Sequence, residues 1–135
     1  MKLKTIVGLL FAMVLMVSCA TRQAVIPENL TPAELIQRAR EASDRYRYSV
    51  ALQHYETLIE RFPFDIDNVI AAEYEMAFIH FRQRRYDLAR IGFTNLLQRY
   101  NAPDAELLPP QFRVLSERLL TIIDEREAAG SRGRF

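Results

Sequence analysis

Apolar residues recur with helical spacing along most of the chain after residue 31. The first such segment opens with Thr31-Pro32-Ala33-Glu34, where Thr can cap a helix, Pro is tolerated at the first helical position and Glu can complete a capping box. The same periodicity predicts further helices over residues 48–62, 68–84, 86–100 and 110–125. The pattern therefore predicts an all-α protein of about five helices.

Turn and loop signals divide these segments. Residues 45–48 are predicted to form a turn, Pro63 ends the second helix, and a proline-containing loop separates the last two helices. Five apolar residues of the last helix are expected to face inward: Phe112, Leu115, Leu119, Ile122 and Ile123. The helical domain is predicted to cover residues 31–126, and residues 127–135 to form a flexible tail.

Residues 1–18 have the pattern of a signal peptide. Lys2 and Lys4 precede an uncharged apolar run over residues 6–17. That run is short for a transmembrane helix, which needs about 20 apolar residues. The sequence therefore predicts export, with residues 1–18 removed.

The only cysteine of the chain lies directly after this run, in Met16-Val17-Ser18-Cys19-Ala20. The segment resembles the lipobox of bacterial lipoproteins, although Met16 replaces the usual Leu. The resemblance implies lipid on Cys19, cleavage before it, and residues 19–30 as a lipidated tether. The alternative is a buried or free thiol after an ordinary secretory signal. Ala20, rather than Asp, resembles an outer-membrane sorting pattern, which implies a lipid-anchored protein facing the periplasm.

Charge gives little guidance to a partner. Beyond residue 18 the chain carries 16 arginines, no lysine and 17 acidic residues. A net charge near zero gives no general attraction to nucleic acid, so we expect no nucleic-acid partner.

An internal repeat appears at a shift of 38 residues. The shift superimposes six residues of the second helix on the fourth, and Ala39 of the first helix on Ala77 of the third. The six pairs are Tyr48 with Tyr86, Ala51 with Ala89, Tyr55 with Phe93, Leu58 with Leu96, Arg61 with Arg99 and Phe62 with Tyr100. Small residues are needed where two antiparallel helices cross closely, and aromatic residues fill the groove beside the crossing.

This pattern resembles the tetratricopeptide repeat, over about residues 32–125. The resemblance implies a short solenoid of helical hairpins, in which the repeat-packing residues are Ala39, Tyr48, Ala51, Tyr55, Ala77, Tyr86, Ala89 and Phe93. The period of 38 exceeds the usual 34, and the extra residues are expected in the loop over 64–68. Together with Cys19 and the Arg61-Phe62-Pro63 ending, the repeats are distantly similar to the lipoprotein subunit of the outer-membrane β-barrel assembly machinery.

Recognisable catalytic chemistry is absent from the sequence. No phosphate-binding loop or nucleophile–base arrangement occurs, and His54 and His80 have no ligand cluster at metal-binding spacing. We therefore predict a non-enzyme without cofactor or metal. The expected function is a protein-binding adaptor in an envelope complex, with a self-associating structural lipoprotein and an unrecognised cell-wall enzyme as alternatives.

One charged feature follows from the repeat. Arg45 and Arg47 lie in the first intra-repeat turn, and Arg82, Arg84 and Arg85 lie at the second. Stacked repeats would align all five along one edge. They can be solvated cations at helix C-termini, or a binding edge for anionic headgroups or an acidic partner.

Overall fold

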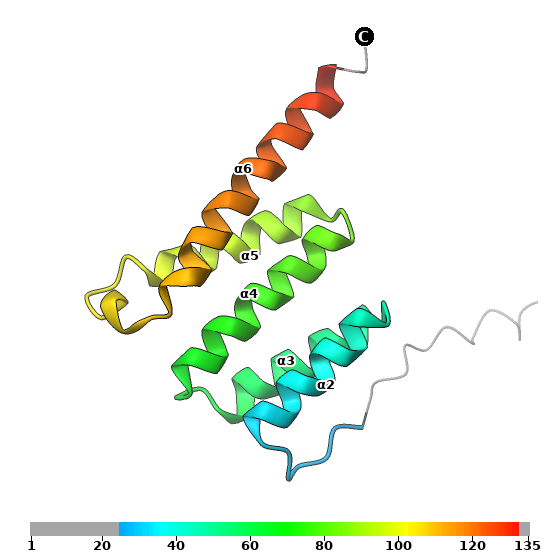
Figure 1. The fold of residues 1–135 in the computed structure, drawn as a ribbon, viewed down its shortest axis with the longest axis vertical. Helices are drawn as coiled ribbons and strands as arrows, with labels where there is room; N and C mark the ends of the chain where they lie inside the picture. Colours follow the sequence, from blue (N-terminus) through cyan, green and yellow to red (C-terminus); the bar gives the residue numbers. More distant parts are fainter. Residues whose placement is uncertain (1–24, 133–135) are drawn as a thin grey trace, which may run out of the picture.

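The computed structural model describes residues 25–132, with side chains to residue 130. The described part is all-helical and contains no strand, which confirms the predicted fold class (Figure 1). Its elements are α2 (Pro32–Asp44), α3 (Tyr48–Arg61), α4 (Ile66–Arg82), α5 (Tyr86–Arg99), the 3-10 turn η2 (Ala105–Leu107) and α6 (Pro110–Arg132). Among the described helices, none is both long and apolar enough to cross a bilayer.

Helix α2 begins with the capping box expected from the sequence. The backbone N–H of Thr31 donates to Oε2 of Glu34 over 2.9 Å, and the N–H of Glu34 donates to Oγ1 of Thr31 over 3.3 Å. The backbone and hydroxyl hydrogen bonds from Thr31 hold the pKa of Glu34 below its usual value. Two of the otherwise unpaired N–H groups at this helix end are thus satisfied.

The two helical hairpins, α2–α3 and α4–α5, end their first helices in the same way. Tyr46 and Arg84 both have φ of 59°. Each donates its N–H to the carbonyl three residues before, over 3.0 Å, and the next residue donates to the carbonyl five residues before. These are the paired hydrogen bonds of a Schellman motif, usually built on glycine. The 38-residue repeat of the sequence is therefore also a repeat of backbone structure.

Helix α4 is shared between two hydrophobic clusters. Val69, Ala72 and Ile79 pack with α2 and α3, whereas Ile70 and Tyr74 pack with α5 and with Ile123 of α6. Burial on two faces requires apolar residues around most of the helix, as the sequence of α4 has. The second hairpin is thus joined to the first through α4 and not through a separate interface.

Most of the predicted repeat-packing residues are buried. Six of them are at most 2% exposed: Ala39, Ala51, Tyr55, Ala77, Ala89 and Phe93. Tyr48 and Tyr86 are half-buried, because each is the first residue of its helix and lies beside the turn.

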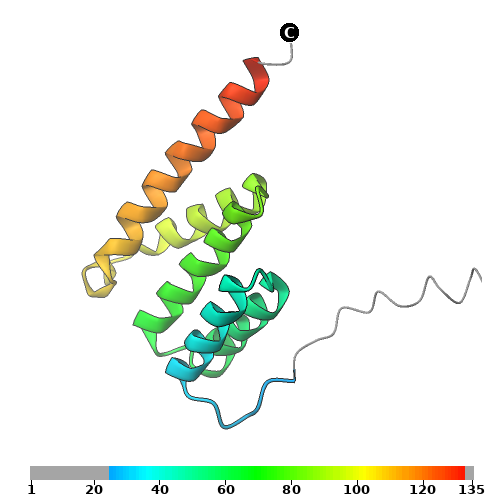
Figure 2. The same cartoon turned by 45° about the vertical axis from the view of Figure 1, so that its right-hand side comes forward.

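Helix α6 departs from the predictions. It continues to Arg132, seven residues beyond the expected end, and projects past the other helices (Figure 2). Arg90 of α5 pairs with Asp124 and Glu127, both at 2.7 Å, which ties α6 to α5 as far as Glu127. Leu115 is 40% exposed and so does not face inward as predicted. Helix α4 also begins two residues early, at Ile66.

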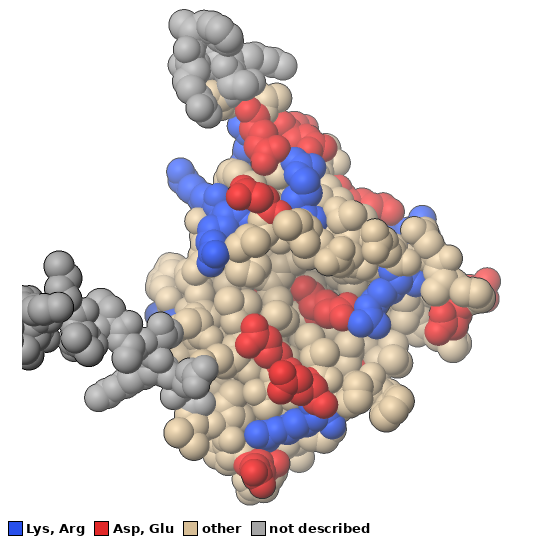
Figure 3. Space-filling model, turned by 180° about the vertical axis from the view of Figure 1, so that it is seen from behind, with Lys and Arg blue, Asp and Glu red and all other residues tan. Residues whose placement is uncertain are grey.

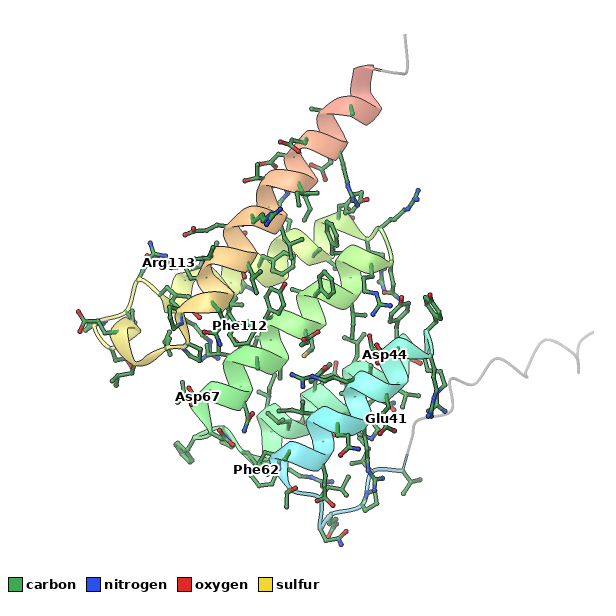
Figure 4. All side chains as sticks on the ribbon, viewed as in Figure 1. Glu41, Asp44, Phe62, Asp67, Phe112 and Arg113 are labelled. Carbon is green, nitrogen blue, oxygen red and sulfur yellow. The ribbon has the colours of Figure 1, made fainter. Side chains whose placement is uncertain are left out.

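The start of α6 is fixed to α4 by aromatic contacts. Phe112, labelled in Figure 4, has its ring centroid 5.2 Å from that of Tyr74. Tyr74 in turn stacks on Phe78 at 6.0 Å. The hydroxyl of Tyr100 donates to the carbonyl of Pro109 over 2.7 Å, which fixes the loop before the helix.

Candidate functional site

An open apolar groove of about 460 Å³ lies across α3, α4 and α5. We call it the α3–α5 groove. It is lined by Ile59 of α3, by Glu73, Met76, Ala77 and His80 of α4, and by Leu88, Ile91, Gly92, Asn95, Leu96 and Arg99 of α5. Figure 3 shows the corresponding face as mostly uncharged, with a hollow beside adjoining acidic and basic side chains.

The groove depends on a glycine in α5. A Cβ added to Gly92 would lie 2.7 Å from Cβ of Ala77, closer than real Cβ contacts. The two helices therefore approach too closely for any larger residue at position 92. In the first hairpin the equivalent position is His54, which is buried and has its Nδ1 2.8 Å from the carbonyl oxygen of Val50. The second hairpin therefore brings its two helices together at a position where the first hairpin has a buried side chain.

Two large apolar side chains at the groove face solvent. Ile91 is 57% exposed and Leu88 is 36% exposed. They lie three residues apart on α5, and therefore on the same side of the helix. Exposed apolar residues are common singly, but a pair beside an apolar groove is the pattern of a binding surface.

One end of the groove holds an ion pair. Nη2 of Arg99 lies 2.5 Å from Oε1 of Glu73. Burial raises the pKa of Glu73, and the charge and hydrogen bond of Arg99 oppose that rise. Glu73 is the only acidic residue that lines the groove, so the described groove offers no pair of carboxyl groups for general acid–base chemistry.

The other end holds His80. Burial lowers the pKa of this imidazole, the nearby positive charge of Arg85 lowers it further, and Gln83 opposes both. A pKa below the ordinary 6.5 leaves His80 neutral at pH 7. The groove is therefore uncharged except at the Glu73–Arg99 end. Within residues 25–130, no group of three possible ligands could hold a metal ion.

The five predicted edge arginines divide into two kinds. Arg82 is engaged in packing: Nη1 donates to Oγ of Ser43 over 3.0 Å, and the guanidinium lies 5.3 Å from the ring centroid of Tyr48 and 5.8 Å from that of Tyr46. It therefore joins the second turn to the first. All five arginines are exposed, but among the described residues the side chains of Arg45, Arg47, Arg84 and Arg85 have no such hydrogen bond or ring contact. Figures 1 and 2 place the α2–α3 and α4–α5 turns along the same edge, which we call the turn edge.

The predicted lipid site, Cys19, and the signal segment lie outside the described residues. The described end of the predicted tether is bound to the domain. Leu30 is only 6% exposed, and Nη1 of Arg61 donates to the carbonyl of Pro27 over 2.7 Å. Ile26 packs against the first core cluster. Residues 26–30 therefore do not form a free spacer, because their apolar side chains find a place in the core.

Comparison with known proteins shows a relative of this chain. The chain is 35% identical over 101 residues to an uncharacterized protein of Treponema pallidum (strain Nichols), which covers 73% of this chain and 40% of that protein. The chain thus spans less than half the length of this relative. No family model and no solved structure matches the chain.

Sequence analysis missed the α3–α5 groove. The signal that could have indicated it is the break in the repeat at Gly92, which aligns with His54. Leu88 and Ile91 were visible as apolar residues, but periodicity alone did not distinguish an exposed pair from core residues. Whether they face the core depends on how α3 and α5 are spaced over α4, which is a tertiary property.

Proposed function

We propose that the protein is a non-catalytic, protein-binding adaptor that a lipid on Cys19 fixes to a membrane. The observation that supports binding most directly is the α3–α5 groove with Ile91 and Leu88 exposed beside it. A groove whose floor is fixed by the Gly92–Ala77 contact needs little rearrangement to receive a partner. Preorganisation of this kind lowers the entropic cost of binding.

The chemistry of the groove indicates the kind of partner. Neutral His80 and the apolar side chains favour the apolar face of a helix or an extended apolar segment. The Glu73–Arg99 pair gives one polar end that can orient the segment. A lipid at Cys19 would confine the search to membrane-associated proteins, so we propose a protein of the cell envelope as the partner.

The internal repeat supports the resemblance to the tetratricopeptide repeat, and the proposed location of the protein in the cell envelope rests in part on that resemblance. The two hairpins have matching turns and buried small residues at equivalent positions, which favours an array of stacked helical repeats. The cellular setting also rests on the resemblance of Met16–Ala20 to the lipobox of bacterial lipoproteins. We therefore retain a place in an outer-membrane assembly complex, facing the periplasm, as the proposed setting.

Self-association is a second candidate, and α6 supports it. Val114 is 63% exposed and Leu115 is 40% exposed, and no later helix of the described residues covers them. A repeat array buries such a face against the next unit. A second copy of the chain could supply that unit.

The lipid anchor has a direct test. Labelled fatty acid should enter the wild-type protein in bacterial cells and should not enter a Cys19→Ala variant, which should also remain uncut. Equal labelling of both proteins would remove the basis for the anchor.

The groove is tested by cross-linking in the cells that make the protein. A photo-reactive amino acid at Asn95, an exposed residue of the groove, should give a specific cross-linked product with an envelope protein. Ile91→Asp should abolish the product because it puts a charge at the apolar wall, whereas Val114→Asp, at an equally exposed residue of α6, should preserve it. Loss of the cross-linked product with Val114→Asp but not with Ile91→Asp would favour self-association. A product that contains only two copies of this chain would favour it too. No product in any form would overturn the adaptor proposal.

A further inference from the structure

The turn edge combines exposed arginines with an exposed tyrosine. Arg45, Tyr46 and Arg47 form the first turn, and Arg84 and Arg85 belong to the second. Tyr46 is 74% exposed, and its ring lies edge-on to Tyr48 with centroids 6.1 Å apart. Tyrosine with arginine is the pairing that proteins place at the boundary between lipid headgroups and water.

The position of Tyr46 is fixed from both sides. Its φ of 59° sets the direction of the side chain, and the guanidinium of Arg82 lies 5.8 Å from the ring. Arg82 itself is held by Ser43 of α2. An exposed ring that is held in place despite an unfavourable backbone conformation is available for contact with another surface.

The remaining charges of the edge are unneutralised. Among the described residues, Arg45, Arg47, Arg84 and Arg85 form no ion pair. Asp44 and Asp87 flank the two turns. Burial is the main cause that raises the pKa of Tyr55 and of Glu75, and the negative charge of Asp44 adds a smaller rise to both. Arg45, Arg47, Arg84 and Arg85 therefore give this edge a local excess of positive charge.

The described start of the chain runs toward this edge. Both ribbon views show residues 25–30 leading from the beginning of α2 back toward the side that bears the two turns (Figures 1 and 2). Arg61 fixes that course through the carbonyls of Pro27 and Ile26. From Cys19 to Val25 there are six residues, which span at most about 22 Å when extended. A lipid on Cys19 therefore keeps the bilayer within reach of the turn edge.

We propose that the turn edge docks on the anionic headgroups of the membrane that holds the lipid anchor. The four free arginines contact the headgroup phosphates, and Tyr46 enters the headgroup layer. This docking rests on the proposed lipid anchor, and it would fix the orientation of the helical domain on the membrane. With the turn edge on the bilayer, the face in Figure 3 that bears the α3–α5 groove opens sideways, along the membrane and toward neighbouring envelope proteins.

The test measures the distance of the edge from the headgroups in the full chain. Vesicles contain zwitterionic lipid with or without phosphatidylglycerol, and a fraction of the headgroups carries a quencher. A fluorescent amino acid replaces either Ser49, an exposed residue beside the first turn, or Gln111, an exposed residue at the start of α6. A lipid is attached at Cys19 by the cell or, if the cell attaches none, by chemical coupling to the thiol.

We expect strong quenching at position 49 in phosphatidylglycerol vesicles and little at position 111. Quenching at 49 should weaken in zwitterionic vesicles and in high salt, because the contacts are between exposed charges. Changing Arg45, Arg47 and Arg85 to Gln should weaken the docking at least about tenfold, at roughly a few-fold per arginine. A matched triple change of Arg38, Arg113 and Arg118 to Gln removes the same charge from other exposed sites and should have little effect.

Two results would overturn the proposal. Equal quenching in anionic and zwitterionic vesicles would show that the edge does not recognise headgroups. The turn-edge variant could also show unchanged quenching and, in cells, lose its cross-linked product. That result would mean that the arginines bind an acidic protein and not the headgroups. Failure of the cell to lipidate Cys19 would count against the anchor alone, because the coupled lipid keeps the docking measurable.

Discussion

Gly92 and Ala77 lie so close that the Cβ missing from Gly92 would come within 2.7 Å of Cβ of Ala77. The neighbouring atoms are the Cβ, Cα and backbone N of Ala77, none of which can rotate away. The contact fixes the spacing of α4 and α5, and with it the floor of the α3–α5 groove. The stability of the second hairpin and the shape of the groove therefore depend on the same residue.

Gly92→Ala should lower the free energy of unfolding by about 1–3 kcal/mol, because the helices must separate to admit one methyl group. Gly130→Ala is the matched control. A Cβ at Gly130 meets nothing within 4 Å, so alanine there should stabilise the helix by up to about 1 kcal/mol. Urea unfolding followed by circular dichroism measures both changes. Equal behaviour of the two variants would mean that the Gly92–Ala77 crossing is not close in solution.

Ala51→Leu and Ala89→Leu test the repeat itself. Both alanines are fully buried at equivalent positions of α3 and α5, so each substitution should cost about 1–3 kcal/mol by overpacking. Ala33→Leu, at an exposed residue near the start of α2, should change stability by no more than about 0.5 kcal/mol. Similar losses at positions 51 and 89 would support equal packing in the two hairpins. Thermal stability like that of the wild type in both would contradict the 38-residue alignment.

The parts of the fold that the sequence predicted are those fixed by local chemistry. Thr31 and Glu34 specify the start of α2, and the small and aromatic repeat residues specify the hairpins. The predicted end of the last helix was wrong. Contacts between α6 and α5 continue beyond residue 125, because Arg90 of α5 pairs with both Asp124 and Glu127 of α6. The prediction that Leu115 faces inward was wrong for a related reason: no other helix of the described residues covers that side of α6.

The candidate site was predicted less well than the fold. The turn edge follows from the repeat, since equal turns recur on the same side of a stacked array. The groove follows from the opposite cause, a position where the repeat fails and His54 is replaced by Gly92. A search for residues that match between repeats therefore finds the turn edge, but it does not find the groove. The sequence also did not indicate that Arg82 contacts Ser43, Tyr46 and Tyr48, because those residues lie 34 to 39 positions away in the chain.

Arg84→Gly should stabilise the protein by about 0.5–1 kcal/mol. The left-handed conformation at φ of 59° costs a residue with a side chain about 1–2 kcal/mol, and the greater freedom of glycine in the unfolded chain offsets part of that gain. Tyr46→Gly should gain less, because it also removes the contact with the Arg82 guanidinium. Gln83→Gly, at the neighbouring residue with φ of −77°, should destabilise. The melting temperature should be highest for Arg84→Gly and should then decrease in the order Tyr46→Gly, wild type, Gln83→Gly. A melting temperature of Arg84→Gly below that of the wild type would contradict the Schellman assignment.

His80 should make stability depend on pH below neutrality. Burial, with help from Arg85, lowers the pKa of the imidazole in the folded protein, whereas the unfolded chain keeps a value near 6.5. Between these two values the unfolded chain binds more protons, so the free energy of unfolding falls as the pH drops through the window below about 6.5. Well above that pH the imidazole is neutral in both states and adds no slope.

Urea unfolding of the wild type and of His80→Gln at pH 6.8 and pH 5.8 measures this contribution. The wild type should lose more stability between the two pH values than the variant, because other groups titrate alike in both and cancel. Arg85→Gln should lie between them, since it removes one of the causes that lower the pKa of His80 but leaves its burial. If His80→Gln lost as much stability as the wild type, the imidazole would be solvated in both states, and the groove would carry a positive charge at mildly acidic pH. An apolar partner should then bind Asn95-labelled protein more weakly at pH 5.8 than at pH 6.8, whereas a groove kept neutral by burial should hold it nearly as well at both.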